Sequence, residues 1–527
     1  MSVRPWPPVR ISHIVVAAVL ATVFAIGVKP VLDPDFWWHL ATGRWIVAHH
    51  AIPFHDVFSL TAQSHRWITH EWLTELLFYA AWYHGGAPLL MVATGLVITA
   101  AFALVYVAAR ERGAPPLLCA PLVLLAALAS AHTWGTRPQM LTMLLVALYT
   151  VGLSRMLVRG RPAPPLWMPL VMVLWVNLHG GFIFGLVLLG IATTGHVVQG
   201  LWEEMEHLRA ARAAPPSDPL DEVYVELPDT AAPARRPAVV DLPRSVAVVL
   251  LTAGATLLNP NGLADALYPF SYLGNNASMR YIAEWVSPDF HQPQYLLFEA
   301  MVLLLLVGGL AGNRRARLAD VLVLLPFTYL AFESVRNISL FAVIAAPVIA
   351  ELLAAFLPAS WQAAGHRPVQ RSRAIVNLVA SLAILLGIAV PSVLAHATLA
   401  AQARAERQTF PAGAVAYLRT HLVPSRGFDS YNWGGYLIWT LYPGRLVYVD
   451  GRPDMYGNRF MNQYIRAYDG QAGWSTLFAR NRLCYALVEP ASGIARALAV
   501  TPGWRVRYHD GHSVLYVETG RTRECPP

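Results

Sequence analysis

Stretches of roughly 20 apolar residues recur along most of this chain, and they constrain its fold more than any other feature. Lipid offers no hydrogen bonds to the backbone, so such stretches predict membrane-spanning helices. The chain is 56% hydrophobic and only 13% charged, about half the charged fraction usual in soluble proteins. We place eleven spans near 11–32, 86–109, 114–131, 139–158, 165–178, 182–201, 245–258, 294–312, 317–332, 338–357 and 374–394.

Charge in the loops predicts the orientation of these spans. The segment 71–84 is apolar but short, so it is either a twelfth crossing or a helix lying in the interface. If it does not cross, the basic loops all fall on the side of the N-terminus: Arg110/Arg112, Arg159/Arg161, 203–244, Arg314/Arg315/Arg317 and Arg367/Arg371/Arg373. The positive-inside rule then predicts a multi-pass protein of the inner (plasma) membrane with a cytoplasmic N-terminus. The net charge of +8 comes from these loops and does not indicate nucleic-acid binding.

The composition divides the chain into two parts. Residues 1–395 form the predicted transmembrane domain, which includes an outer loop, 33–70, and a Pro- and Ala-rich cytoplasmic linker, 203–244. Residues 396–527 are predicted to form an extracytoplasmic soluble α/β domain, with strands at Arg445–Val449, Tyr485–Val488 and Ser513–Val517. The predicted fold class is therefore mainly α, a polytopic helix bundle followed by a small α/β domain.

The outer loop that follows the first span is unusually rich in acids, histidines and arginines: Asp33, Asp35, His39, Arg44, Arg66, His70 and Glu71. Carboxylates at the edge of the hydrocarbon are costly and need a reason. A helix beginning near Asp35 would place Asp35 and His39 on one face. The alternative is an interfacial aromatic belt, with Asp33 or Asp35 as a helix cap.

Further polar residues lie on the same predicted side: Arg137 and Arg336 at span edges, Asn177 and His179 between two short apolar runs, and Glu284 in the loop 259–290. The run from Asn177 to Gly181 predicts a broken helix or a tight turn facing a cavity. An arginine alone at a span end more often extends to the interface than binds a ligand. Several such clusters on one side nevertheless favour an anionic ligand, because arginine suits phosphate.

Two glycine-rich motifs stand out in the soluble part, Tyr431–Tyr436 and 449–457. If their aromatic side chains are exposed, Trp433, Tyr436, Asp450 and Arg452 are candidates for an acceptor-facing surface. The alternative is a turn-rich structure in which Trp433 and Tyr436 belong to the core.

Several common signatures are missing from the sequence. It has no P-loop, no dinucleotide-binding glycine motif, no H-E-x-x-H and no G-x-S-x-G. These gaps argue against nucleotide-driven transport and serine hydrolysis. Three cysteines are also too few for a thiolate metal site.

With these motifs the chain resembles the GT-C class of polytopic glycosyltransferases, which use polyprenyl-phosphate-linked sugars and include protein O-mannosyltransferases, aminoarabinose transferases and the oligosaccharyltransferase catalytic subunit. Asp33-Pro34-Asp35 stands where those enzymes carry their acidic motif, and Asp35 matches the catalytic acid better than Asp33 does. His70-Glu71 stands where many members carry a second polar motif. Tyr431–Tyr436 is distantly similar to the tryptophan-rich motif of oligosaccharyltransferase, but lacks an Asp between Trp433 and Tyr436.

The resemblance implies transfer of a sugar from a membrane-embedded polyprenyl-phosphate donor to a glycan, lipid or protein acceptor. Asp35 would act as the general base in an inverting displacement, while the arginines at 44, 66, 137 and 336 would hold the phosphate with help from His39 and His70. A divalent metal, Mg or Mn, would be held by Asp35 and Glu71, as in some members. Two alternatives use the same residues without chemistry: a transporter or flippase of a lipid-linked glycan, or a membrane scaffold.

Overall fold

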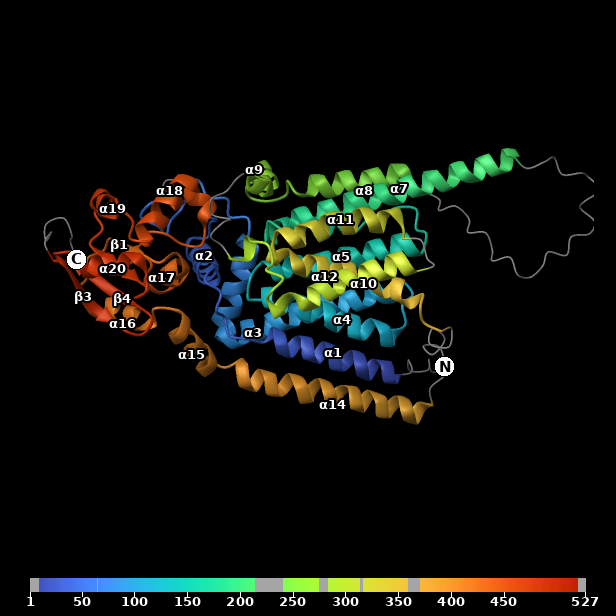
Figure 1. Ribbon diagram of the computed structural model, residues 1–527, viewed down its shortest axis with the longest axis horizontal. Coiled ribbons are helices and arrows are strands. Elements are labelled where there is room, and N and C mark those ends of the chain that lie inside the picture. Colours follow the sequence, from blue (N-terminus) through green and yellow to red (C-terminus); the bar gives the residue numbers. More distant parts are fainter. Residues whose placement is uncertain are drawn as a thin grey trace, which may run out of the picture.

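The computed structural model describes residues 9–63, 65–213, 240–273, 283–312, 316–358 and 370–519. It consists of a long helix bundle and a smaller C-terminal domain at one end of it (Figure 1). The chain begins at the opposite end of the bundle. The predicted bundle followed by a small α/β domain is thus confirmed.

Every predicted span coincides with a helix: α1 (Ile11–Gly27), α3 (Trp72–Glu111), α4 (Pro116–Ser130), α5 (Gln139–Val158), α6 (Met168–Leu178), α7 (Phe182–Ala213), α8 (Leu242–Ala255), α10 (Leu296–Ala311), α11 (Leu318–Glu333), α12 (Ile338–Ala354) and α14 (Arg371–His396). Among the described residues, seven helices are long and apolar enough to cross a membrane, and α1, α6 and α8 are shorter apolar helices. The protein is therefore a multi-pass membrane protein, and the count of eleven crossings stays a prediction.

Two predictions on segment boundaries need separate comment. The first turns of α3 are a distinct helix, because the backbone departs from helical geometry at Gly86, with φ of 61°. Only after this kink does α3 run along the bundle, which suits a segment 71–84 that does not cross. The predicted linker begins inside α7, which continues to Ala213, and residues 214–239 lie outside the described part of the chain.

Small residues allow the bundle helices to approach closely. A Cβ built on Gly27 of α1 would lie 3.1 Å from the Cα of Gly95 in α3. Helix association in lipid depends on such close packing. This crossing fixes the end of α1, and hence the start of the outer loop.

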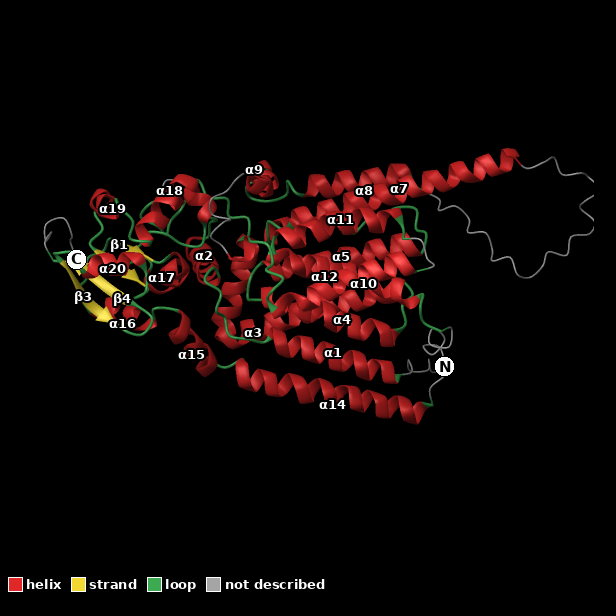
Figure 2. Ribbon diagram, viewed as in Figure 1, coloured by secondary structure: helices red, strands yellow, loops and turns green. Residues whose placement is uncertain are grey.

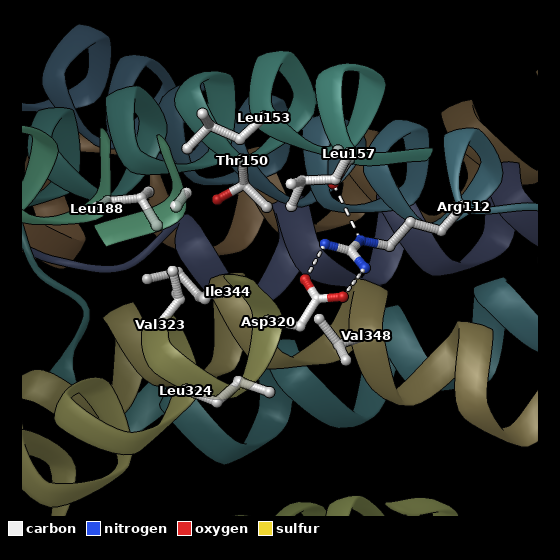
Figure 3. Close-up of a pocket in the computed structure, with 12 residues that line it drawn as sticks. Arg112, Thr150, Leu153, Leu157, Leu188, Asp320, Val323, Leu324, Ile344 and Val348 are labelled. Carbon is white, nitrogen blue, oxygen red and sulfur yellow. Dashed lines mark hydrogen bonds and ion pairs between the residues drawn. The ribbon is translucent and has the colours of Figure 1, made fainter. Parts of the chain in front are cut away.

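A buried charge cluster joins the helices at the end of the bundle away from the C-terminal domain. Arg112 donates to both carboxylate oxygens of Asp320, at 2.6 and 3.0 Å, and to Glu351 at 2.9 Å. Figure 3 shows the guanidinium and the Asp320 carboxylate facing each other beside a cavity of about 20 Å³. Arg317 adds a second contact to Glu351 at 2.7 Å. Two arginines, at the end of α3 and the start of α11, thus neutralise two carboxylates from α11 and α12.

The C-terminal domain is built on a four-stranded sheet with order β1-β2-β4-β3. The strands are β1 (Gly427–Asp429), β2 (Tyr485–Val488), β3 (Trp504–His509) and β4 (Val514–Glu518). The pair β1–β2 is parallel and the other pairs are antiparallel. Helices surround the sheet (Figure 2): α15 (Leu399–Thr409), α16 (Ala412–Thr420), α17 (Gly434–Leu441), α18 (Pro453–Tyr468), α19 (Trp474–Asn481) and α20 (Gly493–Ala499).

The strands predicted at Tyr485–Val488 and near Ser513–Val517 are present, whereas the strand predicted at Arg445–Val449 is wrong. That segment makes a single parallel bridge, from Val447 to Ser59 of the outer loop. Its apolar side chains are buried because it lies between the domain and the outer loop, so burial rather than strand pairing explains its hydrophobicity.

The outer loop and the C-terminal domain share one hydrophobic core. Trp37 of α2 (Phe36–His49) packs edge-on against Phe410 and Tyr436, at centroid distances of 5.7 and 5.1 Å. Val31 exchanges backbone hydrogen bonds with the Gln402 side chain at 2.9 and 3.0 Å. The two segments are distant in sequence but fold as one unit, which encloses the polar motifs at this end of the bundle.

Candidate active site

The acidic motif lies in the connection between α1 and α2. The Asp35 backbone N–H donates to Asp33 Oδ1 at 2.8 Å. Asp35 is the N-cap residue of α2, but its side chain makes no capping hydrogen bond. A capping role therefore does not account for the Asp35 carboxylate.

Asp33 lies at a cavity of about 250 Å³. The Arg137 guanidinium bridges the Asp33 and Glu284 carboxylates, and all three side chains line the cavity together with Lys29 and His132. Lys29 makes no ion pair with any residue the structure describes. Burial and the charge of Arg137 lower the Lys29 pKa. The cavity thus combines two cations with two carboxylates that already share one of them.

Arg336 lies near the same cavity. Its guanidinium is 4.4 Å from the centroid of the Trp285 ring. Its charge acts on the Arg137 guanidinium, and its neighbour Val335 lines the cavity. The predicted residues Arg137, Arg336 and Glu284 therefore converge with Asp33, although they come from three separate loops.

The Asp35 carboxylate is partly buried and has no ion-pair partner among the described residues. The Trp38 indole N–H lies 3.4 Å from Asp35 Oδ1, and the backbone of Gly451 packs so closely that a Cβ there would collide with the same oxygen. Burial raises the pKa of Asp35 to about 7, against the lowering effect of His39. Glu284 and Glu71 contribute to this raised pKa, and the Trp38 hydrogen bond opposes it. A carboxylate with this pKa suits a general base at neutral pH.

Glu71 is surrounded by three histidines. Its oxygens lie 3.3 Å from His39 Nδ1, 3.5 Å from His70 Nε2 and 3.4 Å from His179 Nε2. Burial opposes ionisation of Glu71, but the three histidines outweigh it and lower the Glu71 pKa. Glu75 is also 3.3 Å from His39 Nδ1. Glu71 is therefore the counter-ion of a histidine cluster.

The histidines of this cluster differ in charge. Burial lowers the His70 pKa, but Glu71 more than compensates and raises it to about 9, so His70 is a cation. Burial lowers the His179 pKa to about 3 despite Glu71. The Gly181 N–H donates to His179 Nδ1 at 3.0 Å, so the single proton of His179 faces Glu71. The predicted helix break at this histidine is confirmed between α6 and α7.

The donors do not fit the expected metal site of Asp35 and Glu71. Both Glu71 oxygens already face imidazole nitrogens. Across the described ranges, no group of three His, Cys, Asp or Glu side chains is arranged to hold a metal ion. We therefore derive no chemical step through a metal.

Three predicted residues lie elsewhere. Arg44 donates to the Trp439 carbonyl at 3.2 Å and stacks over its ring, and it does not line the cavity beside Asp33, so its role as a phosphate ligand stays a prediction. Arg66 is exposed and pairs through its backbone with His55. Asn177 accepts from the Trp72 indole at 2.8 Å and donates to the Leu258 carbonyl, which is a structural role.

The expected exposure of the C-terminal motifs is also wrong. Trp433, Tyr436, Asp450 and Arg452 are all at most 5% exposed. Trp433 and Tyr436 belong to the shared core, while Arg452 pairs with Asp450. The glycines of these motifs allow a close approach to the outer loop, which a sequence pattern does not distinguish from an exposed turn.

Sequence reasoning missed three residues at this site. Lys29 is the only lysine in the chain and lies near the outer end of the first predicted span, a signal that was available. Asp265 in α9 (Leu263–Leu267) is fully buried, and neither of its oxygens has a hydrogen-bond partner among the described residues. Burial raises its pKa to about 6, although His70 lowers it. Gly451 is far from Asp35 in the sequence, and only the folded chain brings the two residues into contact.

Comparison with known proteins reveals similarity in structure alone. No protein-family model and no curated protein matches the chain. The Archaeoglobus fulgidus oligosaccharyltransferase, tethered with an acceptor peptide containing the NVT sequon, superimposes with a TM-score of 0.51 at 13% identity over 96% of this chain and 74% of that one. ArnT from Cupriavidus metallidurans, bound to undecaprenyl phosphate, gives 0.46 at 16% identity over 97% and 98%. The first likeness shows that the chain has the GT-C-like fold that the acidic outer loop predicted.

Proposed function

We propose that this chain is a membrane glycosyltransferase that moves a sugar from a polyprenyl-phosphate-linked donor to an extracytoplasmic acceptor. The observation that carries the proposal is the pairing of an ion-pair-free carboxylate, Asp35, whose pKa is about 7, with an adjacent cavity lined by Lys29 and Arg137. The archaeal enzyme with this fold transfers an oligosaccharide, which agrees with this type of reaction.

In the proposed reaction the donor phosphate occupies the cavity. Lys29 and Arg137, with Arg336 behind them, stabilise the negative charge that grows on the departing phosphate. Asp35 takes the proton of the acceptor hydroxyl while the oxygen of that hydroxyl bonds to the anomeric carbon of the donor sugar. The bond from that carbon to the phosphate oxygen breaks on the opposite side, so the configuration inverts.

The proposed orientation follows from the arginine-rich loops. The N-terminus lies in the cytoplasm of a cell with an inner membrane, and the C-terminal domain lies outside. Both the acidic motif and the C-terminal domain are at the end of the bundle opposite the N-terminus (Figure 1). The acceptor therefore approaches from outside.

The test uses the full chain reconstituted in vesicles with polyprenyl phosphate carrying a radiolabelled sugar. A transferase releases free polyprenyl phosphate and moves the label into acceptors from the membrane extract. A flippase moves the intact donor to the other leaflet without releasing phosphate, and a scaffold does neither. Either of these two results contradicts the proposal.

Replacing Lys29 should weaken donor binding. Lys29→Gln removes a cavity cation without breaking an ion pair, so the donor KM should rise about 10- to 100-fold, the equivalent of one charge-assisted hydrogen bond. Arg373→Gln, which alters an exposed residue near the start of α14, is the matched control. Titration of transfer rate against donor concentration checks this, and an unchanged KM would remove Lys29 from the phosphate site.

The transfer rate should depend on pH through Asp35. A general base works only when deprotonated, and burial places the Asp35 pKa at about 7. The value of kcat/KM should therefore rise as pH increases through about 7 and fall below it. A profile that is flat between pH 5 and 8, measured in matched buffers, would contradict the assignment of Asp35.

A further inference from the structure

We infer that the Asp450-Gly451-Arg452 loop of the C-terminal domain is a positioning element for the Asp35 carboxylate. The inference rests on the proposed function, in which Asp35 is the base. It means that the catalytic carboxylate adopts its working orientation only when the C-terminal domain is docked on the outer loop.

The Arg452 side chain binds Asp450 of its own loop and Asp56 of the outer loop. Its guanidinium donates to both oxygens of Asp450, at 2.7 and 2.6 Å, and contacts Asp56 Oδ1 of the outer loop at 2.9 Å. The Tyr456 hydroxyl donates to Asp450 at 2.7 Å. Asp450 is completely buried and Arg452 is 3% exposed. A two-pronged guanidinium contact of this kind fixes direction as well as distance.

Asp56 belongs to the outer loop, so its contact with Arg452 connects the outer loop to the C-terminal domain. Its carboxylate accepts from the Ser59 N–H at 2.9 Å and from the Phe58 N–H at 3.2 Å. The Arg452 guanidinium also lies 4.4 Å from the centroid of the Trp67 ring. The Arg452 side chain therefore contacts both its own loop and the outer loop that contains Asp35.

Gly451 is the point of contact with Asp35. Its neighbours in the chain are the two anchored residues, and its own backbone packs so closely against the Asp35 carboxylate that a Cβ there would displace the carboxylate. The same oxygen faces the Trp38 indole. Gly435 makes a second close approach, because a Cβ there would lie 2.5 Å from the Pro34 carbonyl oxygen. The acidic motif is thus held between α2 and two glycines of the C-terminal domain.

The test compares Gly451→Ala with Gly511→Ala in the full chain, since a Cβ at Gly511 meets nothing within 4 Å. We expect Gly451→Ala to lower kcat about 10- to 100-fold, as for a small misplacement of a catalytic group, with the donor KM unchanged. In an Asp35→Asn background, Gly451→Ala should cause no further loss, because the group that it displaces is already absent.

A second readout does not need activity. Carbodiimides modify protonated carboxyls, so mass spectrometry of Asp35 after labelling at a series of pH values gives its titration midpoint. Displacing Asp35 towards water removes the burial that raises its pKa, so the midpoint should move to lower pH in Gly451→Ala and stay in place in Gly511→Ala. This measurement decides the inference even if the wild type transfers no sugar, a result that would overturn only the proposed function.

Equal kcat and equal labelling midpoints for the two alanine variants would overturn the inference. If Gly451→Ala lowers the melting temperature more than Gly511→Ala does, Arg452→Lys decides instead. It adds no atom beside Asp35 but loses the two-pronged contact with Asp450. A shifted midpoint in Arg452→Lys supports the inference, and an unshifted one overturns it.

Discussion

Asp35→Asn should reduce sugar transfer about 10²- to 10⁴-fold, because an amide of the same shape cannot accept the acceptor's proton. The loss should appear in kcat at saturating donor, since the phosphate cavity keeps Lys29 and Arg137. Asp35 has no ion pair to break among the described residues, so the melting temperature should change little. Radiolabel transfer at matched expression measures the effect.

Asp289→Asn is the control for Asp35→Asn. Asp289 is an exposed carboxylate in the segment before α10, and its partners are its neighbours His291 and Gln292. The Asp289→Asn variant should leave sugar transfer unchanged. Undiminished transfer by Asp35→Asn would remove Asp35 from the mechanism even though the fold stands.

Arg112→Met should be the most destabilising single change at the far end of the bundle. It leaves the buried Asp320 and Glu351 carboxylates with only Arg317 to compensate them. Removing one partner of a buried charge cluster costs about 3–5 kcal/mol. Thermal unfolding of the detergent-solubilised protein should show a clear fall in melting temperature.

Two further variants separate charge from packing at this cluster. Arg155→Met removes a half-exposed arginine that pairs with Glu111, and it should cost no more than about 1 kcal/mol. Combining Arg112→Met with Asp320→Leu leaves the Arg317–Glu351 pair intact, so it should recover part of the loss. If Arg112→Met is as stable as Arg155→Met, the cluster does not hold the helices together.

The sequence was most informative where one physical rule dominates. All eleven apolar segments became helices because lipid leaves the backbone no alternative. The convergence of Arg137, Glu284 and Arg336 with the acidic motif was also predictable, since all lie on the same predicted side of the bundle.

Sequence reasoning failed where contacts between distant segments decide the outcome. The motifs around Trp433 and Asp450 resemble exposed turns, yet they are buried because the outer loop covers them. Arg44 has the right spacing from Asp35, but α17 offers it the Trp439 ring and carbonyl. Glu71 resembles a free carboxylate until three histidines from three segments surround it. Apart from His70, which precedes Glu71 in the sequence, none of these partners can be read from local composition.

The shared core of the outer loop and the C-terminal domain has a consequence for synthesis. Val31 hydrogen-bonds to Gln402, which is synthesised 371 residues later. At about 5–20 residues per second the ribosome needs roughly 20–75 s to reach Gln402. During that time Trp37 lacks Phe410 and Tyr436, against which it later packs. A nascent chain that stops before α15 therefore presents an uncovered aromatic surface outside the membrane. Truncation at the end of the helix bundle would yield an aggregation-prone fragment rather than a minimal enzyme.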